Sequence, residues 1–206
     1  VAARHRDRFV DRRRRAAPSP LRDRRIWRLA LASAPFVLAH VATVSFLVIW
    51  LHETRGWSTF ASAAVLAVAQ VLGAVGRIAV GRWSDVLGRR IVPLRRLVLA
   101  AAACFALGAL VMPGPDVLVV PLLVAGCVLA MSGNALTQVA TAELAGAARA
   151  GTAMGLQGTI LYGIVAVSAP LFGLVVGATS WRAGFALLAL APLGAWWGLR
   201  PLRGAV

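Results

Sequence analysis

The chain alternates between long runs of apolar residues and short polar segments. Six runs are long enough to cross a bilayer, since about 20 helical residues cross about 30 Å of hydrocarbon. Backbone polar groups cannot stay unpaired in lipid, and the runs are too long for barrel strands, so helices are predicted. The predicted spans are residues 29–51, 59–80, 92–112, 117–141, 152–176 and 183–199.

Composition supports the same prediction. The 206 residues are 60% hydrophobic and 14% charged, whereas soluble domains carry about 25% charged residues. The two cysteines, Cys104 and Cys127, both lie inside apolar runs, which predicts neither a disulfide framework nor a metal site. We therefore expect an all-α membrane protein, a six-helix transmembrane bundle, with no metal and no cofactor.

Arginine supplies all 22 basic residues and gives the chain a net charge of +15. Eleven arginines lie in residues 1–28, a density that nucleic-acid-binding segments also show. This segment has no zinc-ligand spacing and almost no aromatic residues to stack on bases, so no nucleic-acid partner is expected. The favoured interpretation is a basic cytoplasmic arm (1–26) without fixed structure, a membrane domain (27–200) and a cytoplasmic tail (201–206).

The arginines also predict the orientation of the domain. With the N-terminus inside, the inner segments 1–28, 81–96, 142–151 and 199–206 hold 11, 5, 1 and 2 arginines. The outer turns hold only Arg55 and Arg182. Because arginine-rich loops stay on the cytoplasmic side, we expect a multi-pass protein of a bacterial cell membrane with both termini in the cytoplasm.

Polar side chains inside spans are costly and therefore informative. They occur in the first, second, fourth and fifth spans, while the third and sixth are expected to face lipid or to be purely structural. This pattern predicts two three-helix repeats around a polar cavity. The midspan His40 could relay protons, hold an anion or only hydrogen-bond a neighbouring helix. The candidate cavity residues are His40, Thr43, Gln70, Asn134, Gln138, Gln157 and Tyr162.

The stretch GRWSDVLGRR (81–90) places one carboxylate among arginines between the second and third spans. It resembles the loop signature of the major facilitator superfamily, Gly-x-Leu-x-Asp-Arg-x-Gly-Arg-Arg/Lys, with Trp83 and Val86 replacing the usual Leu and Arg. The residues that match this gating motif are Gly81, Asp85, Gly88, Arg89 and Arg90.

A second stretch, AELAGAARAGTAMGLQGT (142–159), is similar to the helix 4–5 connection of that family through Glu143, Arg149, Gly151 and Gly155. For Asp85 the sequence leaves two partners open. One is Arg89, four residues on; the other is the N-terminus of a neighbouring helix, which the resemblance assigns to the other half of the protein.

The resemblance implies that the chain is the C-terminal half, or a fragment, of a twelve-helix secondary transporter, with the arm as its central loop. Its partner would be an N-terminal six-helix half or a second copy. The two would rock around a midplane site to move a small polar or anionic solute, with proton coupling left open.

Two other classes compete with this interpretation. The alternative is a stand-alone six-helix protein that dimerises or binds a partner without transport. An enzyme is not expected, because Ser132 lacks the Gly-x-Ser context of an intramembrane serine protease.

Overall fold

The computed structural model describes residues 19–202, and within them every regular element is a helix. The predictions for residues 1–18 and 203–206 lie outside this described part. The all-α, six-helix prediction is confirmed. The long helices are α2 (Arg24–Arg55), α3 (Thr59–Leu87), α4 (Ile91–Leu110), α5 (Asp116–Ala145), α6 (Ala150–Ala178) and α7 (Trp181–Gly198), with short 3-10 helices η1 (Pro20–Arg22) and η2 (Arg200–Leu202).

Five of the six long helices, α2 to α6, are long and apolar enough to cross a membrane. The sixth, α7, has 18 residues, which reach about 27 Å. Its three tryptophans, Arg182 and Pro192 lower its mean hydropathy. It nevertheless packs along α4 and α2 as part of the same bundle.

The helices extend beyond the apolar runs, because a capped helix continues into the polar interface. At the start of α2, the Asp23 carboxylate accepts a hydrogen bond of 2.8 Å from the backbone N–H of Arg25 and so caps the helix. The helix therefore begins inside segment 1–26, for which the sequence predicts an arm without fixed structure. The Trp27 indole N–H also donates to the Leu21 carbonyl at 2.8 Å.

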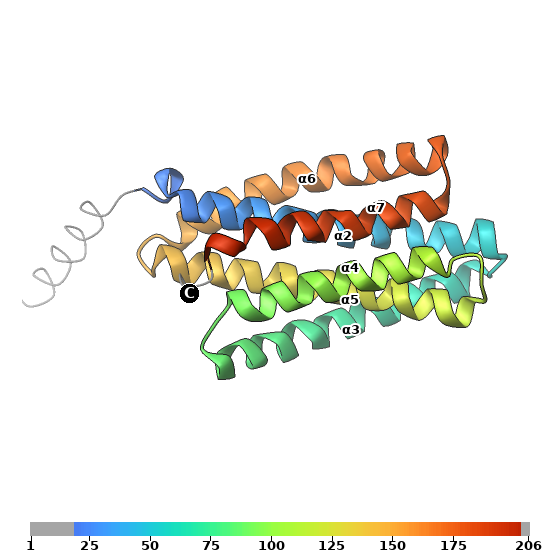
Figure 1. Ribbon diagram of the computed structural model, residues 1–206, viewed down its shortest axis with the longest axis horizontal. Coiled ribbons are helices and arrows are strands. Elements are labelled where there is room, and N and C mark those ends of the chain that lie inside the picture. Colours follow the sequence, from blue (N-terminus) through green and yellow to red (C-terminus); the bar gives the residue numbers. More distant parts are fainter. Residues whose placement is uncertain (1–18, 203–206) are drawn as a thin grey trace, which may run out of the picture.

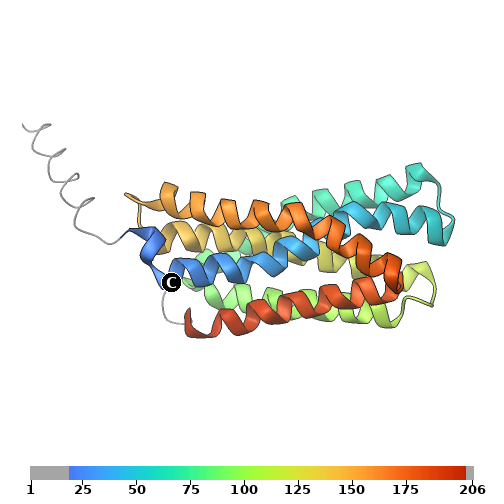
Figure 2. The same cartoon turned by 90° about the horizontal axis from the view of Figure 1, so that it is seen from above.

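Both described termini and the α3–α4 and α5–α6 turns lie at one end of the bundle (Figure 1). We call this the basic end, and the end with the other three turns the opposite end. Helices α4 and α7 lie side by side, and α2 and α5 pack against them (Figures 1 and 2). Helix α3 packs along α5 at one edge, and α6 packs along α2 at the other.

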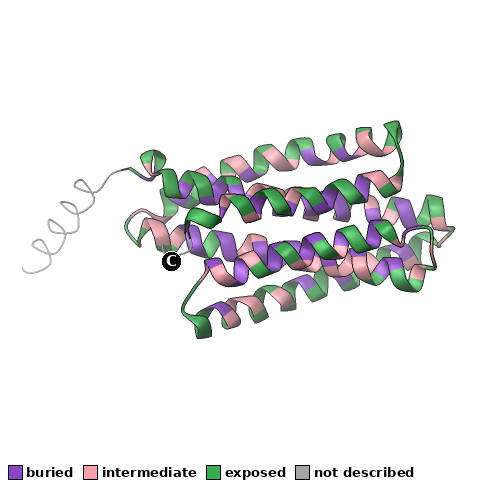
Figure 3. Cartoon of the chain, viewed as in Figure 1, coloured by how far each residue is buried: buried purple, intermediate pink, exposed green. Residues whose placement is uncertain are grey.

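Burial differs sharply between these helices. Half of the most apolar stretch of α4 is buried, against 11% for α3 and 17% for α6. Figure 3 shows exposed residues along both edge helices. Helix α4 therefore belongs to the packed core of the bundle, while the structural role expected for the third and sixth spans stays a prediction. The largest exposed apolar faces belong instead to two helices that the sequence predicts to border the cavity.

Glycines set the closest helix contacts in the core. A Cβ atom at Gly133 of α5 would lie 2.3 Å from the Phe36 ring of α2, so this contact requires glycine. Cβ atoms at Gly73 and Gly76 of α3 would meet Met131 and Ser132 of α5 at 2.5 and 2.6 Å. These contacts fix which face of α3 points into the bundle.

Candidate functional site

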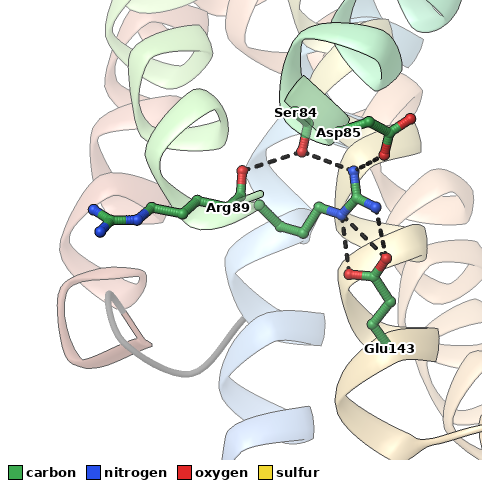
Figure 4. Close-up of polar contacts among 5 residues, drawn as sticks. Ser84, Asp85, Arg89 and Glu143 are labelled. Atoms are coloured by element: carbon green, nitrogen blue, oxygen red, sulfur yellow. Dashed lines mark hydrogen bonds and ion pairs between the residues drawn. The ribbon is translucent and has the colours of Figure 1, made fainter. Parts of the chain in front are cut away.

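Arg90 connects three helix ends at the basic end of the bundle (Figure 4). Helix α3 ends at Leu87, and Gly88 reverses the chain at φ 59°, a left-handed conformation that glycine adopts without strain. Arg90 then occupies the N-cap position of α4 and extends its guanidinium between Asp85 and Glu143. Its Nη1 donates to Asp85 Oδ1 at 2.5 Å, and its Nη2 and Nε donate to Glu143 Oε1 and Oε2 at 2.6 and 2.9 Å.

A serine completes this group, which we call the Arg90 cluster: Ser84, Asp85, Arg90 and Glu143. Arg90 Nη1 donates to Ser84 Oγ at 3.0 Å, and Ser84 Oγ donates to the Arg89 carbonyl at 3.2 Å. The two-point contact with Glu143 is the geometry in which arginine binds carboxylates most strongly. The hydrogen bond to Glu143, followed by that to Asp85, raises the pKa of Arg90 above its ordinary value, so the guanidinium stays charged.

The partner of Asp85 within the described residues is thus Arg90 and not Arg89. The spacing of four residues would bring Asp85 and Arg89 together only if the helix continued past both. The reversal at Gly88 ends α3 first, so the Arg89 side chain points away from the cluster (Figure 4). The cluster also joins the two stretches that the sequence predicts separately, since Arg90 belongs to the first and Glu143 to the second.

The other predicted motif residues lie toward the same end of the bundle. Gly81 lies in α3, where a Cβ atom would meet nothing within 4 Å. Arg149 precedes the first turn of α6, and Gly151 is exposed in that turn.

A pocket of about 380 Å³ lies between α2, α5 and α6. Five of the seven predicted cavity residues line it, together with Val37, Val41 and apolar residues of α6. The five are His40, Asn134, Gln138, Gln157 and Tyr162. Helices α4 and α7 contribute nothing to the lining, which agrees with their few polar residues.

The other two predicted cavity residues lie outside the lining. Thr43 is fully buried, and its hydroxyl donates to the Ala39 carbonyl at 2.7 Å. Gln70 is exposed on α3. Their role in solute binding stays a prediction.

Hydrogen bonds hold some of the polar pocket residues in place, but several of their polar atoms have no hydrogen-bond partner. Gln157 Nε2 donates to Thr137 Oγ1 of α5 at 3.2 Å and to Ser33 Oγ of α2 at 3.4 Å, and so connects three helices. Within the described part of the chain, three buried lining atoms have no hydrogen-bond partner. They are His40 Nε2, Asn134 Oδ1 and Gln157 Oε1. Buried polar atoms normally have partners, so this pocket calls for water or a polar solute.

A second arginine group lies at the opposite end. Arg55 at the end of α2 forms an ion pair of 3.2 Å with Asp116 at the start of α5 and donates to the Met112 carbonyl. Its guanidinium lies 5.0 Å from the ring centroid of the buried Trp50. The Trp57 indole donates to Asp116 Oδ2 at 2.7 Å. We call Trp50, Arg55, Trp57 and Asp116 the Arg55 cluster.

Sequence reasoning missed the Arg55 cluster because it treats the two outer turns as separate connectors. The available signal was that an arginine, a tryptophan and an acid all flank helix ends on the same side of the membrane. That signal does not say which of the turns touch.

Comparison with known proteins decides the family. Residues 3–170 match the Major Facilitator Superfamily family model. The chain is also 38% identical over 173 residues to an uncharacterized MFS-type transporter of Mycobacterium tuberculosis strain H37Rv, and equally so to its counterpart in strain CDC 1551. Each match covers 82% of this chain. The chain belongs to the major facilitator superfamily.

Membership agrees with the bundle of apolar helices, and the two together indicate a multi-pass membrane protein. The chain spans 38% of the length of each of these relatives.

Proposed function

We propose that this chain is one six-helix half of a secondary transporter, which moves a small polar or anionic solute across the cell membrane by alternating access. The observation that carries the proposal is the pocket at midspan, with three buried polar atoms that have no partner among residues 19–202. Its volume of about 380 Å³ lies within the usual range of small-molecule sites. A solute with donors and acceptors would satisfy these atoms.

The partner in this proposal is a second six-helix unit that covers the edge helices. The exposed faces of α3 and α6 are apolar, and several of their glycines have no neighbour. A Cβ atom would meet nothing within 4 Å at Gly81, Gly151, Gly155 or Gly163. Small residues allow close helix approach in membranes, and the relatives are long enough to contain a further set of helices.

Arginine placement supports an orientation with the basic end in the cytoplasm. Among residues 19–202, the opposite end carries only Arg55 and Arg182 in its turns. The remaining arginines lie in the half of the bundle that ends at the described termini, and Arg77 of α3 is the one nearest to midspan. By the positive-inside rule, this distribution supports an orientation with both termini on the cytoplasmic side.

The direct test is transport by the complete gene product in membrane vesicles. The vesicles are offered labelled benzoate, succinate, glutamine, glucose and ethidium. We expect at least one solute to be moved, and its transport to fall at least tenfold in both His40→Ala and His40→Asn. The control is the wild-type protein in vesicles without a gradient across the membrane, where each solute should only equilibrate. If no solute moves in a manner that depends on His40, the proposal fails.

A cross-linking test addresses the competing stand-alone function. Gly155→Cys, placed on the open face of α6 in a protein without other cysteines, should form a disulfide with the second six-helix unit only after a cysteine is added there. Efficient cross-linking between two copies of the Gly155→Cys chain, combined with no transport, would support the stand-alone dimer instead.

A further inference from the structure

Two buried hydroxyl groups fix the orientation of the Gln157 side-chain amide. Its Nε2 lies 3.2 Å from Thr137 Oγ1 and 3.4 Å from Ser33 Oγ. Each hydroxyl has one hydrogen and donates it within its own helix. Thr137 donates to the Asn134 carbonyl at 2.6 Å, and Ser33 donates to the Ala30 carbonyl, also at 2.6 Å. Toward Gln157, both hydroxyl oxygens can therefore only accept.

The opposite orientation of this amide would be unfavourable. It would place Oε1 against two hydroxyl oxygens that have no hydrogen left for it, and all three side chains are buried, where unpaired polar groups are costly. Nε2 therefore faces the wall formed by α2 and α5. Gln157 lines the pocket, whereas Ser33 and Thr137 do not. This leaves Oε1, which has no partner among residues 19–202, for the pocket side of the amide.

Asn134 adds a second hydrogen-bond acceptor to the same pocket. Its Oδ1 is also buried and has no partner within the described part of the chain. An amide oxygen can only accept, so both atoms require N–H or O–H donors from whatever fills the pocket. His40 Nε2 can donate or accept, depending on the tautomer. Among the described lining residues none is an arginine, an aspartate or a glutamate, so the lining offers no countercharge to an ionised solute.

The rest of the lining provides apolar walls. Leu161 and Val165 lie four and eight residues beyond Gln157 on α6, which places them about 6 and 12 Å further along the helix. Val37 and Val41 contribute from α2. A solute that fills the pocket thus contacts apolar side chains as well as two amide oxygens.

We infer that the pocket selects a neutral solute with an apolar body and N–H or O–H donors at one end, such as a primary carboxamide. The donors bind Gln157 Oε1 and Asn134 Oδ1. A carboxylate is disfavoured, because its oxygens only accept and would meet these two acceptors with neither a hydrogen nor a countercharge. This inference rests on the proposed transport function and removes anionic solutes from its substrate class.

The test measures how three matched probes protect a cysteine in the pocket. Met154 lines the pocket one turn before Gln157 and is 43% exposed. Met154→Cys is introduced into the complete gene product with every other cysteine replaced, and the purified protein is labelled with neutral methyl methanethiosulfonate. The probes are benzamide, N,N-dimethylbenzamide and benzoate, at up to about 50 mM because ligands this small bind weakly.

The three probes share a ring and a carbonyl oxygen, but only benzamide has N–H donors and only benzoate is charged. We expect benzamide to slow labelling, and the other two probes to require at least about fivefold higher concentrations for the same effect, because each leaves the buried acceptors without a donor. The measured quantity is the probe concentration that halves the labelling rate.

Two acceptor variants and a control connect this selectivity to the two amide oxygens. Gln157→Met removes Oε1, and Asn134→Ala removes Oδ1 while the contacts of Gln157 with α2 and α5 stay in place. Each should raise the required benzamide concentration about fivefold. The control is Thr159→Val, which removes an exposed hydroxyl of α6 outside the lining and should leave protection by benzamide unchanged.

Four results would overturn the inference in different ways. Protection by benzoate equal to that by benzamide would show a site that accepts anions. Equal protection by N,N-dimethylbenzamide would show that apolar contact alone drives binding. If no probe slows labelling, the pocket does not recognise such donors, although transport of another solute would still support the proposed function. If position 154 is not labelled at all, the pocket is closed to water, and the proposed transport function fails as well.

Discussion

The two arginine clusters lie at opposite ends of the bundle and differ in how far this chain encloses them. Arg55 and Asp116 keep only 20% and 28% of their side-chain surface exposed, and two tryptophans complete the contacts. In the Arg90 cluster the arginine is 16% exposed, but Asp85 and Glu143 keep 63% and 40%. The Arg55 cluster is thus enclosed, and the Arg90 cluster is open toward solvent.

This difference separates a structural contact from one that can accept a further partner. Ion pairs between exposed groups contribute little to stability, whereas removing one member of an enclosed pair leaves a charge without compensation. The Arg55 cluster therefore fastens the α2–α3 turn to the α4–α5 turn. The Arg90 cluster positions Asp85 at the surface, where a further protein segment can reach it.

The largest expected effect comes from breaking the enclosed cluster. Arg55→Gln should lower the free energy of unfolding in detergent by about 2–3 kcal/mol, because Asp116 stays partly buried without its cation. Glu53→Gln is the control, since it removes an exposed charge from the same end of α2 and should cost less than about 0.5 kcal/mol. Equal losses in the two variants would contradict the distinction between the clusters.

A smaller loss is expected at the open cluster. Arg90→Gln should lower the free energy of unfolding by about 1 kcal/mol, because both carboxylates can be solvated once their cation is gone. The neighbouring Arg89→Gln removes the same charge from a side chain that points away (Figure 4) and should change stability by less than about 0.3 kcal/mol. If Arg90→Gln lowered the free energy of unfolding as much as Arg55→Gln, the two clusters would not differ in their contribution to stability, which would contradict the comparison.

The sequence predicts the helices of both ends well, because apolar runs bounded by polar turns define spans without any knowledge of packing. It cannot predict the contact between Arg90 and Glu143, which lie 53 residues apart. That contact depends on how the α3–α4 turn meets the end of α5. For the same reason, the spacing of Asp85 and Arg89 predicts the wrong partner.

The pocket also shows what the sequence cannot predict for a single helix, namely which of its faces points into the bundle. When a span is apolar on every side, its sequence does not determine which face points inward. Asn134 and Gln138 are four residues apart, so they share one face, and both line the pocket. Thr43 lies three residues beyond His40, which rotates it into the core. Gln70 faces outward because Gly73 and Gly76 direct the opposite side of α3 against α5.

The salt dependence of the two ion pairs provides a further test of the difference between the clusters. The coupling energy in a double-mutant cycle of Arg90 with Glu143 should fall by at least half when NaCl rises from about 0.1 to about 1 M, because the Debye length shrinks from about 10 to about 3 Å. The coupling of Arg55 with Asp116 should change much less, since screening by ions is weaker for partly buried pairs. Equal salt dependence of the two coupling energies would show that enclosure does not distinguish them.

The smallest effect on stability is expected for Asp85→Asn, and this variant separates stability from function. Asp85 is mostly exposed, and within residues 19–202 only its Oδ1 forms a hydrogen bond. The substitution should therefore change the free energy of unfolding by less than about 0.5 kcal/mol. If Asp85 also contacts a second six-helix unit at the basic end, the initial transport rate per folded molecule should nevertheless fall several-fold.

The measurement is transport in vesicles of whichever panel solute the wild-type protein moves, normalised to the amount of folded protein. Arg89→Gln serves again as the control and should keep the wild-type rate per folded molecule. An equal loss of folded protein and of transport in Asp85→Asn would assign Asp85 to folding. A selective loss of transport would instead show that the open cluster presents this carboxylate for the conformational cycle. The carboxylate of the enclosed cluster is less available, because Asp116 is ion-paired with Arg55 through Oδ1 and accepts a hydrogen bond from Trp57 through Oδ2.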